Sequence, residues 1–411
     1  MRFRADWLLP ISDAPIRDGW VSVENGRIAG LGSSAPADAI DLGRAVLLPA
    51  LVNAHTHLEL SYLHRRIPPA PRFGEWVRAV MTTRQQYPDP ADPRILDPAR
   101  AALAAARAAG TGLCGDISNT LVTVPLLREA GMPAQVFHEL TGFTEQDPVA
   151  RVRDARNRVD AAGADNDIRI SLAPHAPYSV SAGLFQAIRA DLESHPGSIS
   201  SVHLAEPAEE LELLRHGTGD LRAVLEALGR WPADWRPPGV SPVHYLIDLG
   251  VLDSRMLVVH GVQFDGTDLT QLSSLGVTVV SCPRSNVYVG AGAPPLEVFY
   301  AMDVQVAFGT DSLASVADLN MFMELQEARR LAPRVSARRL LESATLAGAQ
   351  ALGFADSFGS IEPGKRAALI AVDVPAGVTD VEEYLVGGVQ PHQVRWLDEA
   401  TPNFQPPTPN L

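Results

Sequence analysis

Short apolar runs alternate with stretches of helical periodicity through the middle of the chain, and this alternation limits the possible folds more than any other feature. Strands are predicted at Ala45–Leu51, Pro133–Phe137, Ile199–Val202, Met256–Val259, Val277–Val280 and Val304–Phe308. Helices are predicted at Arg100–Ala109, Val149–Ala161, Ala182–Leu192, Leu221–Leu228, Leu319–Arg330 and Ala337–Ala351. Repeats of strand and helix build parallel sheets. Over about three hundred residues without a glycine-rich dinucleotide turn, the pattern favours an α/β fold with a (β/α)8 TIM-like barrel over a doubly wound sheet.

The two ends of the chain have a different pattern. Asn25-Gly26 separates two alternating apolar runs, which is a strong hairpin signal. Near the other end, the turn-rich segment Gly359–Lys365 precedes the buried-strand run Ala368–Val372. Because such strands occur at both ends and not between them, we predict one small β-sandwich domain built from residues 1–48 and 356–411. The barrel is then expected at residues 49–355.

Charge and cysteine content exclude several kinds of partner. The chain has 411 residues, of which 34 are basic and 48 acidic, so its net charge is −14. Nucleic-acid polymers and anionic membranes bind basic patches, and neither is an expected partner. No apolar run approaches the ~18 residues of a membrane span, and the first residues lack a secretory signal. Two cysteines, Cys114 and Cys282, make no disulfide framework, which predicts a reducing, cytoplasmic location.

Four of the strand-like runs end in residues that can bind a metal or move a proton. His55 and His57 follow the first run, His203 follows another, and His260 and Asp311 follow two more. The carboxyl ends of barrel strands meet on one face, so these side chains are expected to come together. His55 and His57 are two residues apart and therefore point to the same side of a strand. Imidazoles with a carboxylate suit zinc, and imidazoles also suit iron.

The motifs around these residues follow an order that resembles the amidohydrolase superfamily, in particular its cytosine/adenosine deaminase-like and chlorohydrolase-like branch. The resemblance extends over nearly the whole chain. It is carried by Pro49–His57, Pro174–Tyr178, His203–Glu206, His260–Gly261, Pro283–Asn286, Gly309–Ser315 and Gly359–Lys365. The order of these motifs is specific, although single motifs are not.

The resemblance implies one divalent metal ion, with zinc expected first and iron as the alternative. Four residues would hold it: His55, His57, His203 and Asp311. The ion would lower the pKa of a bound water towards ~7, and Asp311 would also take up a proton from that water. Glu206 would carry a proton to a ring nitrogen and then to the leaving group. His260 would hydrogen-bond the attacking water or the tetrahedral intermediate.

Further acidic and polar residues are expected near the substrate. By their motif positions, Glu59, His175 and Asn286 are candidate substrate contacts. Glu139 follows the strand Pro133–Phe137 and is expected either to contact substrate, to bind the metal, or to support the metal site from outside its ligand shell.

Three departures from the family pattern narrow these expectations. Lys365 is the only lysine and lies in the C-terminal segment, whereas dinuclear relatives need a modified lysine at a strand end, so one metal is expected. Ser281 stands where many relatives carry a histidine, which leaves the substrate open. Phe73–Trp76 resembles a segment that precedes a ribose-binding acid in nucleoside deaminases, but Met81–Gln86 contains no acid.

The expected activity is hydrolytic deamination of an amino-substituted purine- or pyrimidine-like ring. The segments His55–Ser61 and Cys282–Asn286 resemble deaminases of 6-amino-6-deoxyfutalosine in menaquinone synthesis. Hydrolysis of a cyclic amide, or dechlorination of a heteroaryl chloride, stays open because the same hydroxide attacks a similar carbon. A non-catalytic metal-binding relative and a scaffold that uses the arginine-rich helices Arg151–Arg158 and Arg329–Arg339 are the remaining alternatives. The expected partner is a small heterocyclic molecule, and the resemblance allows a homodimer.

Overall fold

Parallel strands form the centre of the molecule. The computed structural model describes residues 1–397, so part of the predicted C-terminal segment, 398–411, lies outside the described residues. Within the described residues, eight strands run parallel in two four-stranded sheets. The sheets comprise β6 (Leu51–Thr56), β7 (Thr111–Ser118), β8 (Ala134–Leu140) and β9 (Ile168–Pro174), then β10 (Ser200–Leu204), β11 (Met256–His260), β12 (Thr278–Ser281) and β13 (Gln305–Phe308). β9 also lies against β10, and β13 lies against β6, where Thr56 and Asp311 form a parallel bridge.

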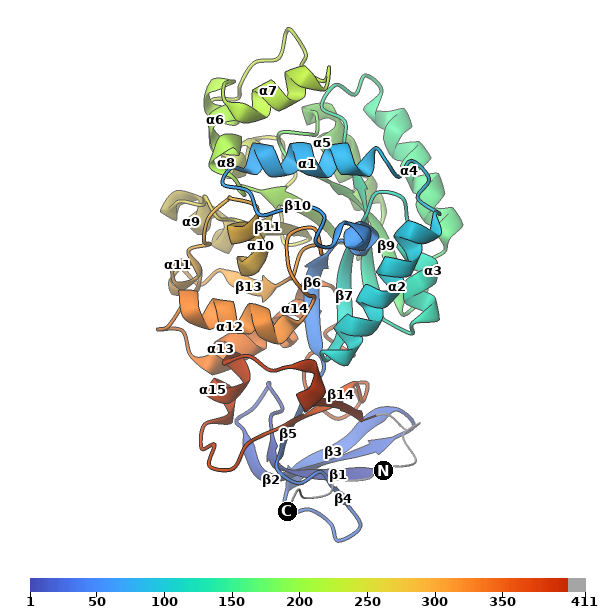
Figure 1. Cartoon of the computed structure of the whole chain (residues 1–411), viewed down its shortest axis with the longest axis vertical. Helices are drawn as coiled ribbons and strands as arrows, with labels where there is room; N and C mark the ends of the chain where they lie inside the picture. Colours follow the sequence, from blue (N-terminus) through green and yellow to red (C-terminus); the bar gives the residue numbers. More distant parts are fainter. Residues whose placement is uncertain (398–411) are drawn as a thin grey trace.

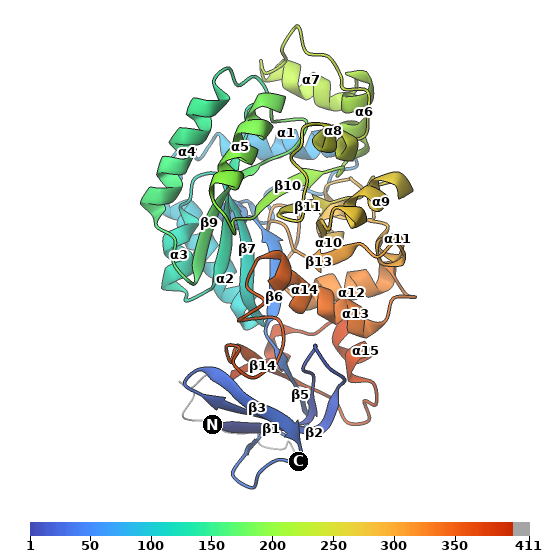
Figure 2. The same ribbon diagram turned by 180° about the vertical axis from the view of Figure 1, so that it is seen from behind.

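Helices follow most of these strands and cover the outside of the sheets. Figures 1 and 2 show α4 and α5 on one side of the molecule and α9 to α13 on the other. Their bounds are α2 (Pro93–Ala108), α3 (Thr123–Glu129), α4 (Pro148–Ala162), α5 (Ala182–Ser194), α6 (Ala208–His216), α7 (Asp220–Ala227), α8 (Pro242–Asp248), α9 (Gly266–Ser274), α10 (Pro283–Tyr288), α11 (Leu296–Ala301), α12 (Met321–Leu331), α13 (Ala337–Ser343) and α14 (Leu346–Ala351). The α/β class predicted from the alternation is therefore confirmed.

Polar caps explain where several helices begin. Asp147 caps α4 by accepting from the backbone N–H of Ala150, and Pro148 fills the first helical position. The predicted range Val149–Ala161 agrees with this helix. By contrast, α2 begins well before the predicted Arg100, because Asp92 caps it and Pro98 is accommodated inside.

Two predicted elements are each divided in the structure. Ala45–Leu51 is not one strand: β5 (Ala45–Pro49) pairs in a separate sheet, and β6 begins after Ala50. Pro49 has no N–H to continue a ladder, which favours the change of sheet at this point. Ala337–Ala351 is not one helix either, because Thr345 has φ −136° and ψ −93° and separates α13 from α14.

A second sheet combines strands from both ends of the chain. Its order is β15-β14-β5-β1-β2-β3, and β4 pairs with β1. The strands are β1 (Arg2–Leu8), β2 (Ile16–Glu24), β3 (Arg27–Ser33), β4 (Ile40–Asp41), β14 (Leu369–Asp373) and β15 (Val394–Leu397). As predicted, Asn25 and Gly26 turn β2 into β3, and both have positive φ, 53° and 71°. Figure 1 shows this sheet below the parallel strands.

One helix that the sequence pattern did not predict crosses the other end of the molecule. α1 (Phe73–Arg84) follows the short 3-10 helix η1 (Leu58–Leu63) and lies beyond the tip of β6, between α7 and α4 (Figure 1). The remaining elements, α15 (Val381–Val386) and η2 (Pro391–Gln393), connect β14 to β15. Within residues 1–397, no helix has the length and apolar character needed to cross a bilayer.

Candidate active site

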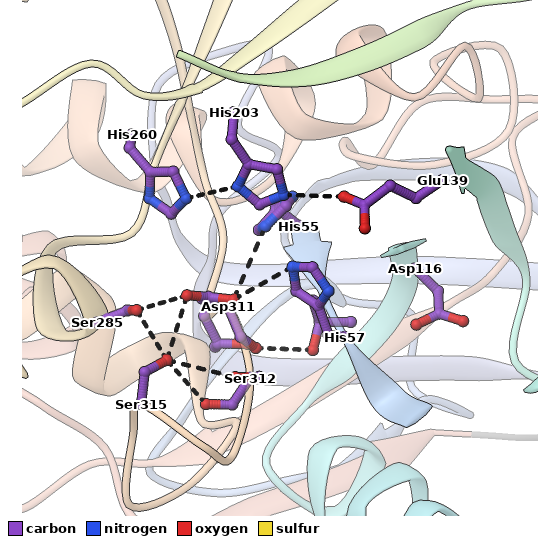
Figure 3. A network of polar contacts seen from close by, with 12 residues as sticks. His55, His57, Asp116, Glu139, His203, His260, Ser285, Asp311, Ser312 and Ser315 are labelled. Atoms are coloured by element: carbon purple, nitrogen blue, oxygen red, sulfur yellow. Dashed lines mark hydrogen bonds and ion pairs between the residues drawn. The ribbon is translucent and has the colours of Figure 1, made fainter. Parts of the chain in front are cut away.

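Three histidines and one aspartate from distant parts of the sequence converge at the carboxyl ends of the strands (Figure 3). His55 lies near the end of β6 and His57 just beyond it, His203 lies near the end of β10, and Asp311 follows β13. The ring centroid of His55 is 4.9 Å from those of His57 and of His203. The structure thus brings together the four residues expected to hold a metal.

The donor atoms of this cluster suit a single divalent ion. His57 Nε2 lies 3.4 Å from Asp311 Oδ1, and His55 Nε2 lies 3.9 Å from the same oxygen. Two ligands of one tetrahedral zinc ion, each about 2.1 Å from it, are about 3.4 Å apart. His55 is fully buried, yet neither ring nitrogen has a hydrogen-bond partner among residues 1–397. Buried polar atoms normally have partners, so these orphaned nitrogens fit metal binding.

The protonation of the histidines also suits metal binding. Burial, and then the neighbouring imidazoles of His203 and His57, lower the pKa of His55 well below its usual range. Burial also lowers the pKa of His57, although Asp311 opposes this shift. Neutral imidazoles are the form that binds a metal, so the lowered pKa values of His55 and His57 favour metal binding.

Asp311 is positioned by backbone geometry and by two serines. Its backbone is left-handed, with φ 59°, and its N–H donates to the carbonyl oxygen of His55 at 3.0 Å. Ser285 Oγ donates to Asp311 Oδ2 at 2.6 Å, and Ser315 Oγ lies 3.2 Å from the same oxygen. A Cβ at Gly309 would lie 2.7 Å from the Cβ and carbonyl oxygen of His55, so only glycine fits there.

A second polar group extends from the metal cluster. His203 Nδ1 lies 2.9 Å from His260 Nε2, and Asn286 Nδ2 lies 2.9 Å from His260 Nδ1. Asn286 Nδ2 also lies 3.5 Å from Glu206 Oε1, which is 3.6 Å from His260 Nδ1. His260 and Glu206, the predicted catalytic residues, are therefore neighbours. Asn286 contacts both of them and is buried.

Glu206 has the electrostatic character of a proton donor. Burial, followed by the carboxylates of Asp311 and Glu210, raises the pKa of Glu206 well above its usual range. Glu210, buried in α6, accepts from the backbone N–H of Glu206 at 3.2 Å, and burial raises the pKa of Glu210 to about 8. A carboxyl group whose pKa is raised towards neutrality can both donate and accept a proton during turnover.

Of the two other acidic residues expected near the substrate, Glu59 and Glu139, only Glu139 lines the pocket. Glu59 is buried outside the main pocket, and its carboxylate accepts from Ser118 Oγ, the N–H of Asn119 and Thr120 Oγ1. Glu139 lines the pocket, where Asn119 Nδ2 donates to it at 2.8 Å.

His175 also faces this pocket, and its Nδ1 lies 2.6 Å from Ser179 Oγ. Burial lowers the pKa of His175 to about 4. Although burial opposes it, the imidazoles of His175 and His203 lower the pKa of Glu139 below its usual range. The pocket therefore contains a neutral imidazole beside an ionised carboxylate.

The pocket has a volume of about 410 Å³ and reaches the metal cluster. Its walls beyond the polar residues are mostly apolar side chains of α1 and α7: Phe73, Trp76, Val77, Val80, Met81, Leu221, Val224 and Leu225. Ser281, which replaces a common histidine, is fully buried and lies outside this lining.

Several residues of the site were missed from the sequence. Ser285 stands inside a motif that was already singled out, so its position beside Asn286 could have suggested a role. Asp116 in β7 is fully buried and accepts from Leu58 N–H and Thr123 Oγ1, and burial raises its pKa to about 7. Arg84, the last residue of α1, lines the pocket and donates from Nη2 to Asn119 Oδ1 at 3.0 Å. Spacing could not identify it, because α1 was not predicted.

The chain is similar in sequence and structure to known proteins. It is 32% identical over 336 residues to an aminodeoxyfutalosine deaminase of Deinococcus radiodurans, covering 77% of this chain and 76% of that protein. The structure matches a Helicobacter pylori aminofutalosine deaminase in complex with methylthio-coformycin, with TM-score 0.82, 25% identity and coverage of 94% and 95%. It also matches an adenosine deaminase from Xanthomonas campestris with bound zinc, with TM-score 0.78, 27% identity and coverage of 96% and 90%.

The match to a family model agrees with the motif order and with the geometry of the histidine cluster. The model of the amidohydrolase family matches residues 46–404, which is most of the chain. With strand-end histidines, Asp311 and a pocket above them, the chain belongs to the amidohydrolase family.

Proposed function

We propose that this protein is a metal-dependent deaminase that hydrolyses an amino group from an aminopurine-like ring. The observation that carries the proposal is the pairing of Glu206 and His260 beside the cluster of His55, His57, His203 and Asp311, at the base of one pocket. Deamination is also the reaction named for the Deinococcus relative and for the Helicobacter and Xanthomonas structures.

Zinc is the proposed ion, because three imidazoles and one carboxylate suit it and because the Xanthomonas structure contains it. When bound, the ion supplies a water that is acidic enough to act as hydroxide near neutral pH. Asp311 Oδ1, which faces His57 at 3.4 Å, accepts the proton of the attacking water. Ser285 and Ser315 hold its other oxygen and so fix the orientation of the carboxyl group.

Glu206 donates a proton to the ring nitrogen beside the attacked carbon and then to the leaving ammonia. The raised pKa of Glu206 keeps this proton available near neutral pH. Asn286 contacts both Glu206 and His260 and so fixes their positions relative to each other. For His260 to hydrogen-bond the oxygen that adds to the ring, as we propose, its Nε2 exchanges the 2.9 Å contact with His203 Nδ1 for that oxygen. His175, neutral at physiological pH, offers Nε2 to the bound heterocycle, while Ser179 holds Nδ1.

The finer features of the architecture are proposed on the same basis. We propose that the two parallel sheets close into a (β/α)8 barrel at residues 49–355, supported by the contacts of β9 with β10 and of β13 with β6. The sheet that joins both ends supports a small β domain at residues 1–48 and from 356 onwards. Two buried free thiols, Cys114 and Cys282, support a cytoplasmic location, and a homodimer stays a prediction.

Glu206→Gln tests the proposal. This variant is expected to retain its zinc and to lose turnover of an aminopurine nucleoside by about 10² or more, since proton transfer contributes about that factor. Glu209→Gln, a change at the start of the adjoining helix α6, is the matched control and should keep full activity. Ammonia release and bound zinc are measured together. Full activity of Glu206→Gln would refute the role of Glu206, and no ammonia from any ring amine by zinc-loaded protein would refute deamination.

A further inference from the structure

A buried ion pair joins α10 to α12 outside the lining of the pocket. Arg284 directly precedes Ser285 and Asn286 in α10, but it does not line the pocket. Its partner is Glu324 of α12, a helix that lies against α10, and the side chain of Glu324 is fully buried. The proposed deamination uses neither Arg284 nor Glu324, so this ion pair needs another explanation.

Glu324 contacts Arg284 at two places. The Nε of Arg284 donates to Glu324 Oε1 at 2.6 Å, and the backbone N–H of Arg284 donates to Glu324 Oε2 at 3.3 Å. Within the described residues, the side chain of the N-cap residue of α10, Cys282, makes no capping hydrogen bond, and Pro283 at the first helical position has no N–H. The N–H at the second position usually bonds to the N-cap side chain. Here Glu324, from another helix, supplies that acceptor.

The guanidinium of Arg284 also binds the loop that follows β13. Its Nη1 donates to Asp318 Oδ1 at 2.9 Å, and its Nη2 donates to the carbonyl oxygen of Asp318 at 2.9 Å. Asp318 lies between Asp311 and α12, and its carboxylate also accepts from the N–H of Asn320, which caps α12. Arg284 therefore joins three segments: the start of α10, the loop after Asp311 and the helix α12.

Two of these segments carry residues of the candidate active site. Ser285 Oγ donates to Asp311 Oδ2 at 2.6 Å, and Asn286 Nδ2 lies 2.9 Å from His260 Nδ1. Because Ser285 and Asn286 directly follow Arg284, a shift of Arg284 would move both. A displacement of about 1 Å at the reacting groups can lower a rate by about 10²-fold. The contacts of Arg284 thus bear on the distance between α10 and Asp311.

A gain in stability does not explain why this ion pair is buried. The side chains of Arg284 and Glu324 are 18% and 0% exposed, so both charges are largely removed from water. That removal costs free energy which the attraction between the charges often does not return, and apolar residues of similar volume are commonly as stable or more so. What apolar residues cannot supply is a set of directed hydrogen bonds. The pair therefore suits a role in placing the segments that it joins.

We propose that Arg284 and Glu324 are positioning residues that fix the start of α10 relative to the loop after β13. Through this contact they hold Ser285 against Asp311 and keep Asn286 beside the proton-transfer residues. They act through these neighbours and do not touch the substrate. The kinetic side of this inference rests on the proposed deaminase function, whereas its effect on zinc binding needs no turnover.

Replacing the whole pair with apolar residues separates positioning from stability. In the double variant Arg284→Met with Glu324→Leu, the midpoint of urea unfolding is expected to equal or exceed that of the unmodified protein. The dissociation constant for zinc, measured by competition with a chromophoric chelator, should rise about 10-fold, because Ser285 no longer holds Asp311. With 5′-methylthioadenosine as the probe and ammonia release as the assay, kcat should fall by about 10²-fold. KM should change by less than about twofold, because neither residue lines the pocket.

Another buried ion pair provides the matched control. Arg156 of α4 donates from Nε to Asp191 Oδ1 of α5 at 3.0 Å, and the two side chains are 15% and 9% exposed. Neither residue lines the pocket or contacts α10 or α12. Arg156→Met with Asp191→Leu removes a comparable pair, and it should leave zinc affinity, kcat and KM within about twofold of the unmodified protein.

Conservative variants test the geometry of the pair and give a result even if the double variant does not fold. Glu324→Gln keeps one oxygen acceptor, which can serve either the guanidinium or the N–H of Arg284 but not both. Arg284→Lys keeps the charge but lacks the planar fork that reaches Glu324 and Asp318 together. Each should lose about 10-fold in kcat while circular dichroism shows a folded protein, which is less than the loss in the double variant.

The outcomes separate the positioning role from the deaminase function. Unchanged zinc affinity and kcat in the folded double variant, or in both conservative variants, would overturn the positioning role. An equal loss in the control variant of Arg156 and Asp191 would also overturn it, because any buried ion pair would then have the same effect. If the unmodified, zinc-loaded protein releases no ammonia from any ring amine, the deaminase function fails, and the zinc affinities alone decide whether Arg284 and Glu324 position the site.

Discussion

Replacing Ser285 with alanine is expected to weaken metal binding about 10-fold. Ser285 Oγ lies 2.6 Å from Asp311 Oδ2 and 2.8 Å from Ser315 Oγ. A hydroxyl has one proton, and Ser285 gives it to the carboxylate, which is its shorter contact and the charged acceptor. Loss of a hydrogen bond to a charged group costs about 1.5–3 kcal/mol, which is about 10- to 100-fold in affinity. Ser315, 3.2 Å from the same oxygen, compensates in part and places the effect near the lower limit.

Competition with a chromophoric chelator measures the dissociation constant for zinc, and circular dichroism checks that each variant is folded. Ser312→Ala is the matched control, because Ser312 is buried nearby and its Oγ lies 3.5 Å from Ser315 Oγ. Ser285→Ala combined with Ser315→Ala should lose about 100-fold, since Asp311 Oδ2 then has neither hydroxyl. An unchanged zinc affinity in the double variant would show that these serines do not position a metal ligand.

Three other changes probe the same region. Gly309→Ala should lower the zinc content of the purified protein, measured by elemental analysis, because its Cβ would lie 2.7 Å from His55 atoms. Asn286→Ala should keep zinc and lower kcat by about 10-fold or more, because His260 loses a 2.9 Å contact that orients it. Asp116→Asn should change the pH dependence of stability measured by urea unfolding. Burial raises the pKa of Asp116 from about 3.9 to about 7, so native protein keeps this proton and its free energy of unfolding falls as pH rises between those values, by up to about 1.4 kcal/mol per pH unit. The asparagine variant lacks that slope.

Contrary results would be informative for each change. Full zinc content in Gly309→Ala would mean that β6 can move away from the new methyl group. Unchanged kcat in Asn286→Ala would remove Asn286 from the catalytic arrangement. A slope for Asp116→Asn equal to that of the unmodified protein between about pH 4 and pH 7 would show that Asp116 is ionised in the native state.

The sequence predicted the metal cluster because its determinants are local. Side chains alternate along a strand, so His55 and His57 lie on the same side. The carboxyl ends of barrel strands meet on one face, which brings His203, His260 and Asp311 to the same place. The resemblance to the amidohydrolase motifs then predicted which of these residues bind the metal and which transfer protons, and spacing alone could not distinguish these roles. The structure places these side chains together as expected, while their roles in metal binding and proton transfer stay predictions.

The walls of the pocket were not predictable in the same way. α1 places few residues in the core, since only Phe73, Gly74 and Val80 of this helix are buried. Glu59 was expected at the substrate, but the hydrogen bonds that hold it come from residues sixty positions away. Such tertiary contacts leave no mark in local spacing. The break at Thr345 likewise depends on a backbone conformation that propensity does not show.

The change of sheet between β5 and β6 is where the sheet built from both ends of the chain meets the parallel strands. β14, from the far end of the chain, pairs along β5, and Ala368 accepts from the N–H of Ala50. One residue later β6 begins, and it carries His55 only five positions after Ala50. The strand that carries His55 is therefore held at its base by β14, which is synthesised after every strand of the two parallel sheets. A nascent chain that lacks β14 would leave the base of β6 without these contacts, so metal binding is expected to follow the synthesis of β14.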